Sequence, residues 1–483
     1  FYAAVHFQPA NPQWKDFGTL NQYVTRVQSF LQSGKPDNDV LLYYPIIDRY
    51  SQAGGELLQH FDGMERNFEG TDFEYASKWM LEHGYSFDFF SDRQLQKIST
   101  SGSRLMSGGN QYKIIFLPAN KLISDNSFQK LMNLAKGGAV ILVYKTLPQD
   151  VPGFALLENR RKLFQQLVAQ LNFSEEGKIK KAIVGKGAFY IGDDLEALLS
   201  VTNVRKEELV ENGFGVIRRK NADGYTYFIN NRTDKPFGGW VSLNAAAESV
   251  ALFDAMTGKN GLAKWRIAGD GMIQVWLQLT PFESIIAQTY STKKTGAAYV
   301  YFEAIGKPKK LNDAWTISFL NGGPSLPAKQ ILKELGSWTE LEGEEVKNFS
   351  GTARYATSFA KPPGSATAWL LDLGKVNETV EVFLNGKKLT TLIGPTFQTT
   401  IPSYLLNLTN TLEVVVANLM ANRISYMDRN SIPWKIFYNT NMPARRRENS
   451  KKGIFDASSW KPLASGLTGP VSLTPLAISM FNK

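Results

Sequence analysis

The sequence contains no cysteine and only three histidines in 483 residues. Without cysteine, structural disulfides, thiol catalysis and thiolate metal sites are all excluded. Two of the histidines, His60 and His83, are too isolated in the sequence to form a metal site, and we expect no metal ion or cofactor in this chain. No apolar run approaches the roughly 20 residues that cross a bilayer, so we expect no membrane partner.

The excess of positive over negative charge is also small. The net charge of +10 comes from 54 basic and 44 acidic residues, which is a modest excess for this length. The one dense basic run, between Arg445 and Lys452, has no module of stacking aromatic residues around it and is interpreted as a solvated loop. We therefore expect no nucleic-acid partner. The hydrophobic content of 43% is enough to bury several cores, which predicts three or four domains.

The N-terminal residues contain an amphipathic helix that no earlier element covers. Thr19 and Gln22 have the spacing of a capping box, and Gly34 followed by Pro36 ends the helix. The apolar stripe consists of Leu20, Tyr23, Val24, Val27, Phe30 and Leu31. Because residues 1–7 supply at most one short strand, we expect that a larger domain precedes residue 1 and that this helix is the end of a fold rather than its beginning.

The next part of the chain has the alternation of an α/β layer. Apolar strand patterns at residues 40–44, 112–117 and 139–144 are separated by helix patterns, the first of which opens with a capping box at Thr71 and Glu74. This order predicts a parallel sheet with crossover helices. No glycine-rich phosphate loop follows the first strand. Instead, a long connection from Pro45 to Gly70 contains Asp48, and we interpret it as a working loop or a docking surface.

From about residue 186 the pattern changes to short alternating runs with turn residues between them, which is typical of β-sandwiches. Asn385-Gly386 between two apolar runs is a strong hairpin signal. The fold class is therefore multidomain α/β plus all-β. The predicted domains are an N-terminal strand, loop and helix at 1–36, an α/β domain at 37–185, a first β-sandwich at 186–308 and a second one at 309–483.

Several ordered pieces of the chain resemble glycoside hydrolase family 106, the α-L-rhamnosidase family. The final pieces resemble the galactose-binding-like jelly roll that is attached to many sugar hydrolases, including family 2: Gly336-Ser-Trp338, residues 349–355, Leu371-Asp-Leu-Gly374, Asn385-Gly386, Gly394-Pro395 and residues 465–470. The opening, from His6 to Lys35, is similar to the last strand-to-helix turn of a (β/α)8 barrel, which implies that residues 1–36 are the last strand, loop and helix of a barrel whose other parts precede this chain. The α/β layer resembles a glutamine-amidotransferase-like domain.

The resemblance implies a parent glycoside hydrolase that cleaves terminal rhamnose from glycans, with carbohydrate as the substrate and a periplasmic or secreted location. In the family, the acid and base carboxylates and an associated calcium ion belong to earlier barrel strands. Those strands do not occur in this sequence, so the chain alone is expected to lack the catalytic carboxylates and to need the missing barrel as its partner. Two alternatives remain open, namely a non-catalytic carbohydrate-binding or scaffold protein and a modular polysaccharide lyase.

Four residues are candidate substrate contacts. His6, Asn11 and Trp14 follow the proposed last barrel strand, where barrel enzymes assemble their sites. A tryptophan offers an apolar face to a sugar ring, while histidine and asparagine offer neutral donors and acceptors to hydroxyl groups. Asp48 is the fourth candidate because its long loop follows the first strand of the α/β layer. For each of these residues a structural role is the competing interpretation. Glu207, by contrast, lies in a charge-rich stretch and is expected on the surface.

Overall fold

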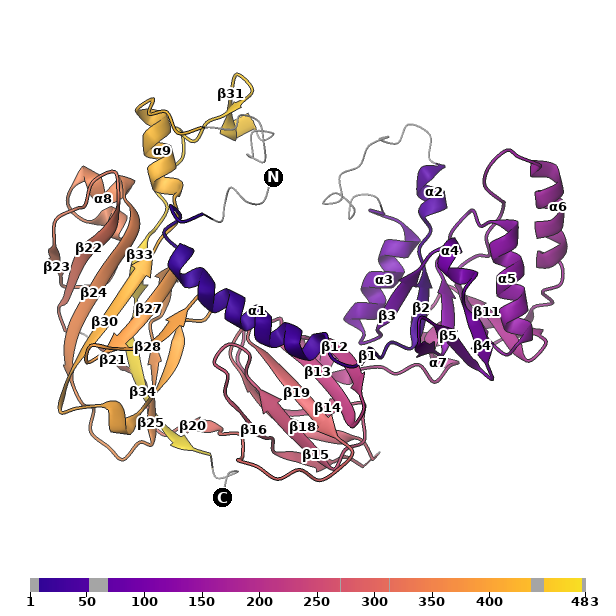
Figure 1. Ribbon diagram of the computed structural model, residues 1–483, viewed down its shortest axis with the longest axis horizontal. Coiled ribbons are helices and arrows are strands. Elements are labelled where there is room, and N and C mark those ends of the chain that lie inside the picture. The colour runs from indigo at the N-terminus through magenta and orange to yellow at the C-terminus, as the bar shows by residue number, and fades with distance from the viewer. Residues whose placement is uncertain (1–7, 52–67, 270, 312, 436–446, 480–483) are drawn as a thin grey trace.

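A computed structural model describes residues 8–51, 68–269, 271–311, 313–435 and 447–479. Figure 1 shows an α/β region, a middle β region and a C-terminal β region, with the long helix α1 (Phe17–Leu31) lying along the two β regions. Among the described residues, no helix combines the length and the apolar character that crossing a bilayer requires.

The α/β region is built on a sheet of seven strands in the order β3-β2-β7-β8-β11-β10-β9. Its first five strands pair in parallel, as the alternating pattern predicted, and the last two are antiparallel. The strands are β2 (Val40–Tyr43), β3 (Phe87–Phe90), β7 (Ile114–Leu117), β8 (Val140–Tyr144), β9 (Ser174–Glu176), β10 (Ile179–Val184) and β11 (Gly187–Gly192).

Helices cover both faces of this sheet. Buried residues of α3 (Asp72–Glu82) and α7 (Leu195–Ser200) pack with one face, and those of α5 (Asp125–Lys136) and α6 (Leu157–Val168) pack with the other. Thr71 caps α3 as predicted, since its hydroxyl accepts the Glu74 N–H at 3.2 Å. The short elements are α2 (Ile46–Tyr50), α4 (Asp92–Leu95), β4 (Ser99–Ser101), β5 (Arg104–Ser107) and β6 (Asn110–Tyr112).

The middle β region has two antiparallel sheets that share one core, with buried residues from both. The larger sheet consists of β1 (Lys35–Pro36), β12 (Phe214–Asn221), β13 (Gly224–Asn231), β19 (Ser284–Tyr290), β15 (Ser249–Phe253) and β16 (Asn260–Leu262). The smaller one consists of β14 (Phe237–Leu243), β18 (Ile273–Leu279) and β17 (Trp265–Ile267). Because β1 directly follows α1, the N-terminal segment is part of this region's own sheet.

The C-terminal β region also buries one core between two sheets, and Trp338, Tyr355 and Trp369 belong to it. One sheet contains β22 (Trp315–Gly323), β23 (Gln330–Leu332), β24 (Ser350–Ala360), β27 (Thr379–Leu384), β28 (Lys387–Leu392) and β30 (Thr409–Ala417). The other contains β20 (Phe302–Ala304), β21 (Lys309–Lys310), β25 (Ala368–Asp372), β29 (Gln398–Pro402) and β34 (Ser472–Ile478). The remaining elements are α8 (Glu344–Asn348), α9 (Ala421–Arg429), β26 (Lys375–Asn377), β31 (Ser450–Lys451), β32 (Ile454–Phe455) and β33 (Gly466–Gly469).

Helix α1 begins at Phe17, two residues before the capping box that the sequence predicted at Thr19. The reason is that a 3₁₀ turn, η2 (Trp14–Asp16), runs directly into the helix and starts it earlier. The apolar stripe of α1 is partly covered by later parts of the chain. The Phe30 ring lies 4.8 Å from the Phe253 ring, and Tyr23 shares a hydrogen bond of 2.7 Å with Ser284. Val24 remains 39% exposed.

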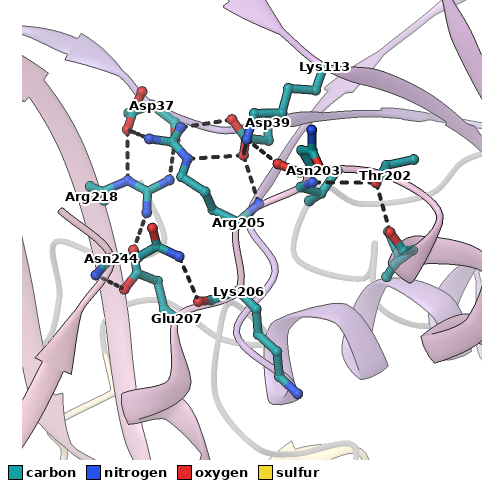
Figure 2. Close-up of polar contacts among 12 residues, drawn as sticks. Asp37, Asp39, Lys113, Thr202, Asn203, Arg205, Lys206, Glu207, Arg218 and Asn244 are labelled. Atoms are coloured by element: carbon teal, nitrogen blue, oxygen red, sulfur yellow. Dashed lines mark hydrogen bonds and ion pairs between the residues drawn. The ribbon is translucent and has the colours of Figure 1, made fainter. Parts of the chain in front are cut away.

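A network of ion pairs connects the α/β region with the middle β region (Figure 2). Arg205 pairs with Asp39 and with Asp37, each at 2.8 Å, and Arg218 pairs with Asp37 at 2.8 Å and also with Glu207. Glu207 is buried and not on the surface, so the prediction from its charge-rich neighbours was wrong. The partner that permits its burial, Arg218, lies on β12 and is not recognisable from the local sequence.

Candidate functional site

The residues before α1 form two successive turns that present Trp14. The Asn11 N–H donates to the Gln8 carbonyl at 2.9 Å, and the Trp14 N–H donates to the Asn11 carbonyl at 3.0 Å. The Asn11 side-chain oxygen accepts the Gln13 N–H at 3.0 Å, which is a local turn that asparagine favours. Asn11 therefore shapes the loop that carries Trp14. His6 lies outside the described residues.

Trp14 is 45% exposed, which is unusual for so large an apolar side chain. Its indole is nearly parallel to the Phe17 ring, with 6.5 Å between centroids and an interplanar angle of 6°. Phe17 thereby limits the orientations of the indole without burying it. The accessible part of the ring has the flat apolar surface that the C–H side of a sugar requires.

The same turn is attached to the C-terminal β region through Asp16 and Lys15. Asp16 is 2% exposed, and the Thr379 hydroxyl donates to its Oδ2 at 2.5 Å. Its Oδ1 has no hydrogen-bond partner among the described residues. Burial raises the pKa of Asp16, and the bond from Thr379 opposes that shift only in part. Lys15 pairs with Glu381, which also pairs with Lys388 at 2.6 Å. These contacts fix the position of Trp14 relative to β27.

A polar hollow of about 640 Å³ lies between this turn and the loops of the C-terminal β region. We call it the Gln13 hollow, and its lining includes Gln13, Lys375, Glu378, Thr379 and Phe397. The Glu378 carboxyl is half-buried, and burial raises its pKa, with Lys375 acting in the opposite direction. An amide, an ammonium, a hydroxyl and a carboxyl around a space of this size suit a ligand rich in hydroxyl groups.

Asp48 belongs to a different part of the molecule. It lies on α2, at the carboxyl end of β2, and its two side-chain oxygens accept the backbone N–H groups of Lys121 at 2.6 Å and Leu122 at 2.7 Å. These bonds attach α2 to the segment that follows β7. Figure 1 shows α2 well apart from the start of α1, so the structure does not bring Asp48 together with Trp14. A substrate contact by Asp48 stays a prediction, as do those of His6, Asn11 and Trp14.

Gln13, Lys375 and Glu378 are not recognisable as a group from the sequence. Residue 13 is separated from residues 375–378 by most of the chain, and no spacing rule connects them. The signals were Gly374 and the Gly394-Pro395 pair, which border the hollow and belong to motifs of the family resemblance. No group of three or more histidine, aspartate or glutamate side chains able to hold a metal ion occurs among the described residues.

The buried carboxyl of Asp16 gives a pH-dependent prediction. Because its pKa is higher in the folded state than the usual 3.8, the fold prefers its protonated form. Its stabilising contribution is therefore complete below pH 3.8 and is lost as the pH rises through the folded-state pKa. Asp16→Asn removes this loss, so its free energy of unfolding relative to the unmodified protein rises by about 1 kcal/mol between pH 4 and pH 7.

Urea unfolding at four pH values checks this expectation, with the exposed Asp234→Asn as the control. The control removes a negative charge without touching a buried group. We expect its free energy of unfolding relative to the unmodified protein to be the same at all four pH values. The assignment of Asp16 as the group that titrates is contradicted if the difference in free energy of unfolding between Asp16→Asn and the unmodified protein stays constant over the whole pH range.

Comparisons with known proteins agree with this architecture. A family model described as alpha-L-rhamnosidase matches residues 6–267, which is more than half of the chain. A "Putative beta-glucuronidase" of Formosa agariphila is 30% identical over an alignment of 297 positions that covers 57% of this chain and 24% of that protein. A rhamnosidase structure from Novosphingobium sp. PP1Y superposes with a TM-score of 0.69 at 22% identity, covering 97% of this chain and 42% of that one. This chain therefore spans less than half the length of either relative.

Proposed function

This chain belongs to the α-L-rhamnosidase family of glycoside hydrolases, and we propose that it is the accessory part of an enzyme that removes terminal α-L-rhamnose from oligosaccharides or polysaccharides. Water is the co-substrate of this acetal cleavage. The location that suits such substrates is the periplasm or the outside of the cell. The observation that carries the proposal is the exposed indole of Trp14, whose turn is attached to the C-terminal β region by the Asp16–Thr379 contact and whose neighbour Gln13 lines the hollow.

The chemistry requires two carboxyl groups about 5 to 10 Å apart, one protonated and one ionised. Around the turn that carries Trp14 the described residues provide Asp16, Glu378 and Glu381, but Asp16 is 2% exposed and cannot reach a substrate, and Glu381 is paired with both Lys15 and Lys388. Glu378 alone cannot serve as both acid and base. We therefore propose that a neighbouring barrel supplies the catalytic pair and any calcium ion, and that Trp14 and the Gln13 hollow bind the sugar next to it.

We expect the intact protein to hydrolyse 4-nitrophenyl α-L-rhamnoside, and Trp14→Ala to lower kcat/KM about tenfold. Losing roughly 50 to 60 Å² of apolar contact, at about 25 cal/mol per Å², corresponds to a change of this size. Trp14→Phe keeps an aromatic face and is expected to retain most of the activity. Steady-state kinetics with the released nitrophenolate provides the measurement.

The matching β-glucuronide is the second substrate of the assay, because one relative carries the name of a glucuronidase. Hydrolysis of the glucuronide but not of the rhamnoside would overturn the substrate assignment while leaving a glycoside hydrolase. Equal kcat/KM for Trp14→Ala and the unmodified protein would show instead that Trp14 is not a substrate contact.

A further inference from the structure

A second cavity, of about 440 Å³, lies where the α/β region meets the middle β region. We call it the cationic cavity. Several separate parts of the chain line it. Strand β1 contributes Lys35, strands β5 and β6 contribute Arg104, Asn110 and Gln111, and the β12–β13 hairpin contributes Lys220 and Tyr225. The paired residues Asp37, Asp39, Lys113 and Arg205 complete the lining. Helix α1, with 15 residues, is roughly 22 Å long and separates this cavity from the Gln13 hollow at its other end.

The carboxylates that line the cationic cavity are already paired. Asp39 pairs with Arg205 and Lys113, both at 2.8 Å, and Asp37 pairs with Arg205 at 2.8 Å. Figure 2 shows these pairs as one connected network. The network therefore does not neutralise the other cations of the cavity.

Three cations remain in excess. Lys35 donates to the Gly109 carbonyl at 3.2 Å, and no described carboxylate pairs with Lys35, Arg104 or Lys220. The positive field reaches the neighbouring Lys113, because burial together with the charges of Arg205 and Arg104 lowers the pKa of that ammonium despite its pairing with Asp39. A concave site with charges of one sign attracts a ligand of the opposite sign.

The other lining groups indicate which kind of anion fits. Asn110 and Gln111 offer amide donors and acceptors to hydroxyl groups, and Tyr225 offers a ring for the apolar face of a sugar. A guanidinium such as that of Arg104 binds planar or tetrahedral oxyanions with directed hydrogen bonds. A solvated surface would also carry lysines, but it would not place three unpaired cations, two amides and an aromatic ring around one cavity.

We propose that the cationic cavity binds an acidic oligosaccharide through the carboxylate or sulfate group of one of its sugars. This inference rests on the proposed function, since it assigns a charged glycan to a protein of the rhamnosidase family. The cavity then serves as an additional binding site that retains a charged polymer on the protein while a neutral terminal sugar is removed elsewhere.

Isothermal titration calorimetry on the intact protein tests the inference with four probes. A galacturonate oligosaccharide supplies carboxylates, its fully methyl-esterified form is the neutral match, a sulfated galactan oligosaccharide supplies sulfate esters, and sodium sulfate is the free anion. We expect at least one acidic oligosaccharide to bind at least tenfold more tightly than the neutral one, and its binding to weaken with added salt. The preferred acidic probe identifies the anion.

The variant Arg104→Gln/Lys220→Gln is expected to weaken that binding about tenfold or more. The control, Lys329→Gln/Lys333→Gln, removes the same charge from exposed lysines of the C-terminal β region and is expected to bind normally. Equal weakening in both variants would show that only net charge matters and would overturn the inference. So would neutral and acidic oligosaccharides that bind alike, or sodium sulfate that binds as tightly as any oligosaccharide, because the cavity would then hold an adventitious ion only.

The rhamnoside assay is carried out separately on the same samples, and both double variants should hydrolyse the small neutral rhamnoside normally. If acidic oligosaccharides bind at the cavity but no rhamnoside is hydrolysed, the cavity assignment stands and the proposed function is wrong. If rhamnoside is hydrolysed but no acidic oligosaccharide binds, the cavity assignment is wrong and the proposed function stands.

Discussion

Replacing Arg218 with methionine is expected to lower the free energy of unfolding by about 3 to 5 kcal/mol, because it leaves a buried carboxylate without its counterion. The Arg218 side chain is 3% exposed, and that of its partner Glu207 is 7% exposed. Among the described residues, Glu207 then keeps the hydrogen bond that its Oε2 accepts from the Asn244 N–H at 3.2 Å. Asp37 is affected less, since Arg205 still pairs with it at 2.8 Å.

The position of Arg218 adds a second consequence. Arg218 lies on β12 of the middle β region, while its partner Asp37 and the paired Asp39 precede β2 of the α/β region. The interaction therefore stabilises the junction of two regions as well as one core. We expect the α/β region and the middle β region of the unmodified protein to unfold in one urea transition. In Arg218→Met we expect them to unfold in two separate transitions, followed by tryptophan fluorescence and far-ultraviolet circular dichroism.

Two further variants distinguish the loss of a counterion from the loss of packing. Arg218→Met/Glu207→Leu removes both charges and is expected to recover most of the stability, since an apolar pair of similar size replaces an ion pair at little cost. Lys178→Met breaks the exposed pair of Lys178 with Asp194 and should leave unfolding unchanged. A double variant as unstable as Arg218→Met alone would mean that the shape of the arginine, and not the charge of Glu207, determines stability here.

Features that depend on residues close together in the sequence could be predicted, and features that depend on residues far apart could not. The parallel sheet, the Thr71 cap and the Asn385-Gly386 hairpin depend on neighbouring residues and were all predicted. In the hairpin, β27 pairs with β28 and both turn residues have positive φ, 52° and 78°. Glu207 was placed wrongly because a counterion from another strand decides its burial. The Gln13 hollow and the cationic cavity likewise combine residues from separate elements, which periodicity cannot bring together.

Replacing Gly466 with alanine is expected to cause the second large loss of stability. Its φ is +93°, and a Cβ built there would lie 2.1 Å from the Tyr355 hydroxyl oxygen and 2.7 Å from a Trp338 ring carbon. Both aromatic side chains are fully buried in the core, so neither can move away cheaply. Gly466→Ala combines an unfavourable backbone conformation with overpacking and is expected to lower the free energy of unfolding by about 3 to 4 kcal/mol, measured by urea denaturation.

Two other glycines separate these causes. Gly386 has a φ of +78° and no atom within 4 Å of a Cβ, so Gly386→Ala is expected to cost only about 1 kcal/mol for its backbone conformation. Gly238 is exposed, lies in open space and has no positive φ, and its alanine variant should change little. If Gly466→Ala costs no more than Gly386→Ala, the core adjusts around the added methyl group and the overpacking argument is wrong.

The same substitution also connects the core with the Gln13 hollow. Gly466 begins β33 and is paired with Asn377 on β26, the strand that carries Lys375 and precedes Glu378. A backbone shift at Gly466 is therefore transmitted to the lining of the hollow, whereas one at Gly386 is not. We expect Gly466→Ala, assayed at a temperature where it is still folded, to raise KM for the rhamnoside. If the KM of Gly466→Ala equals that of Gly386→Ala, the hollow does not take part in binding the rhamnoside.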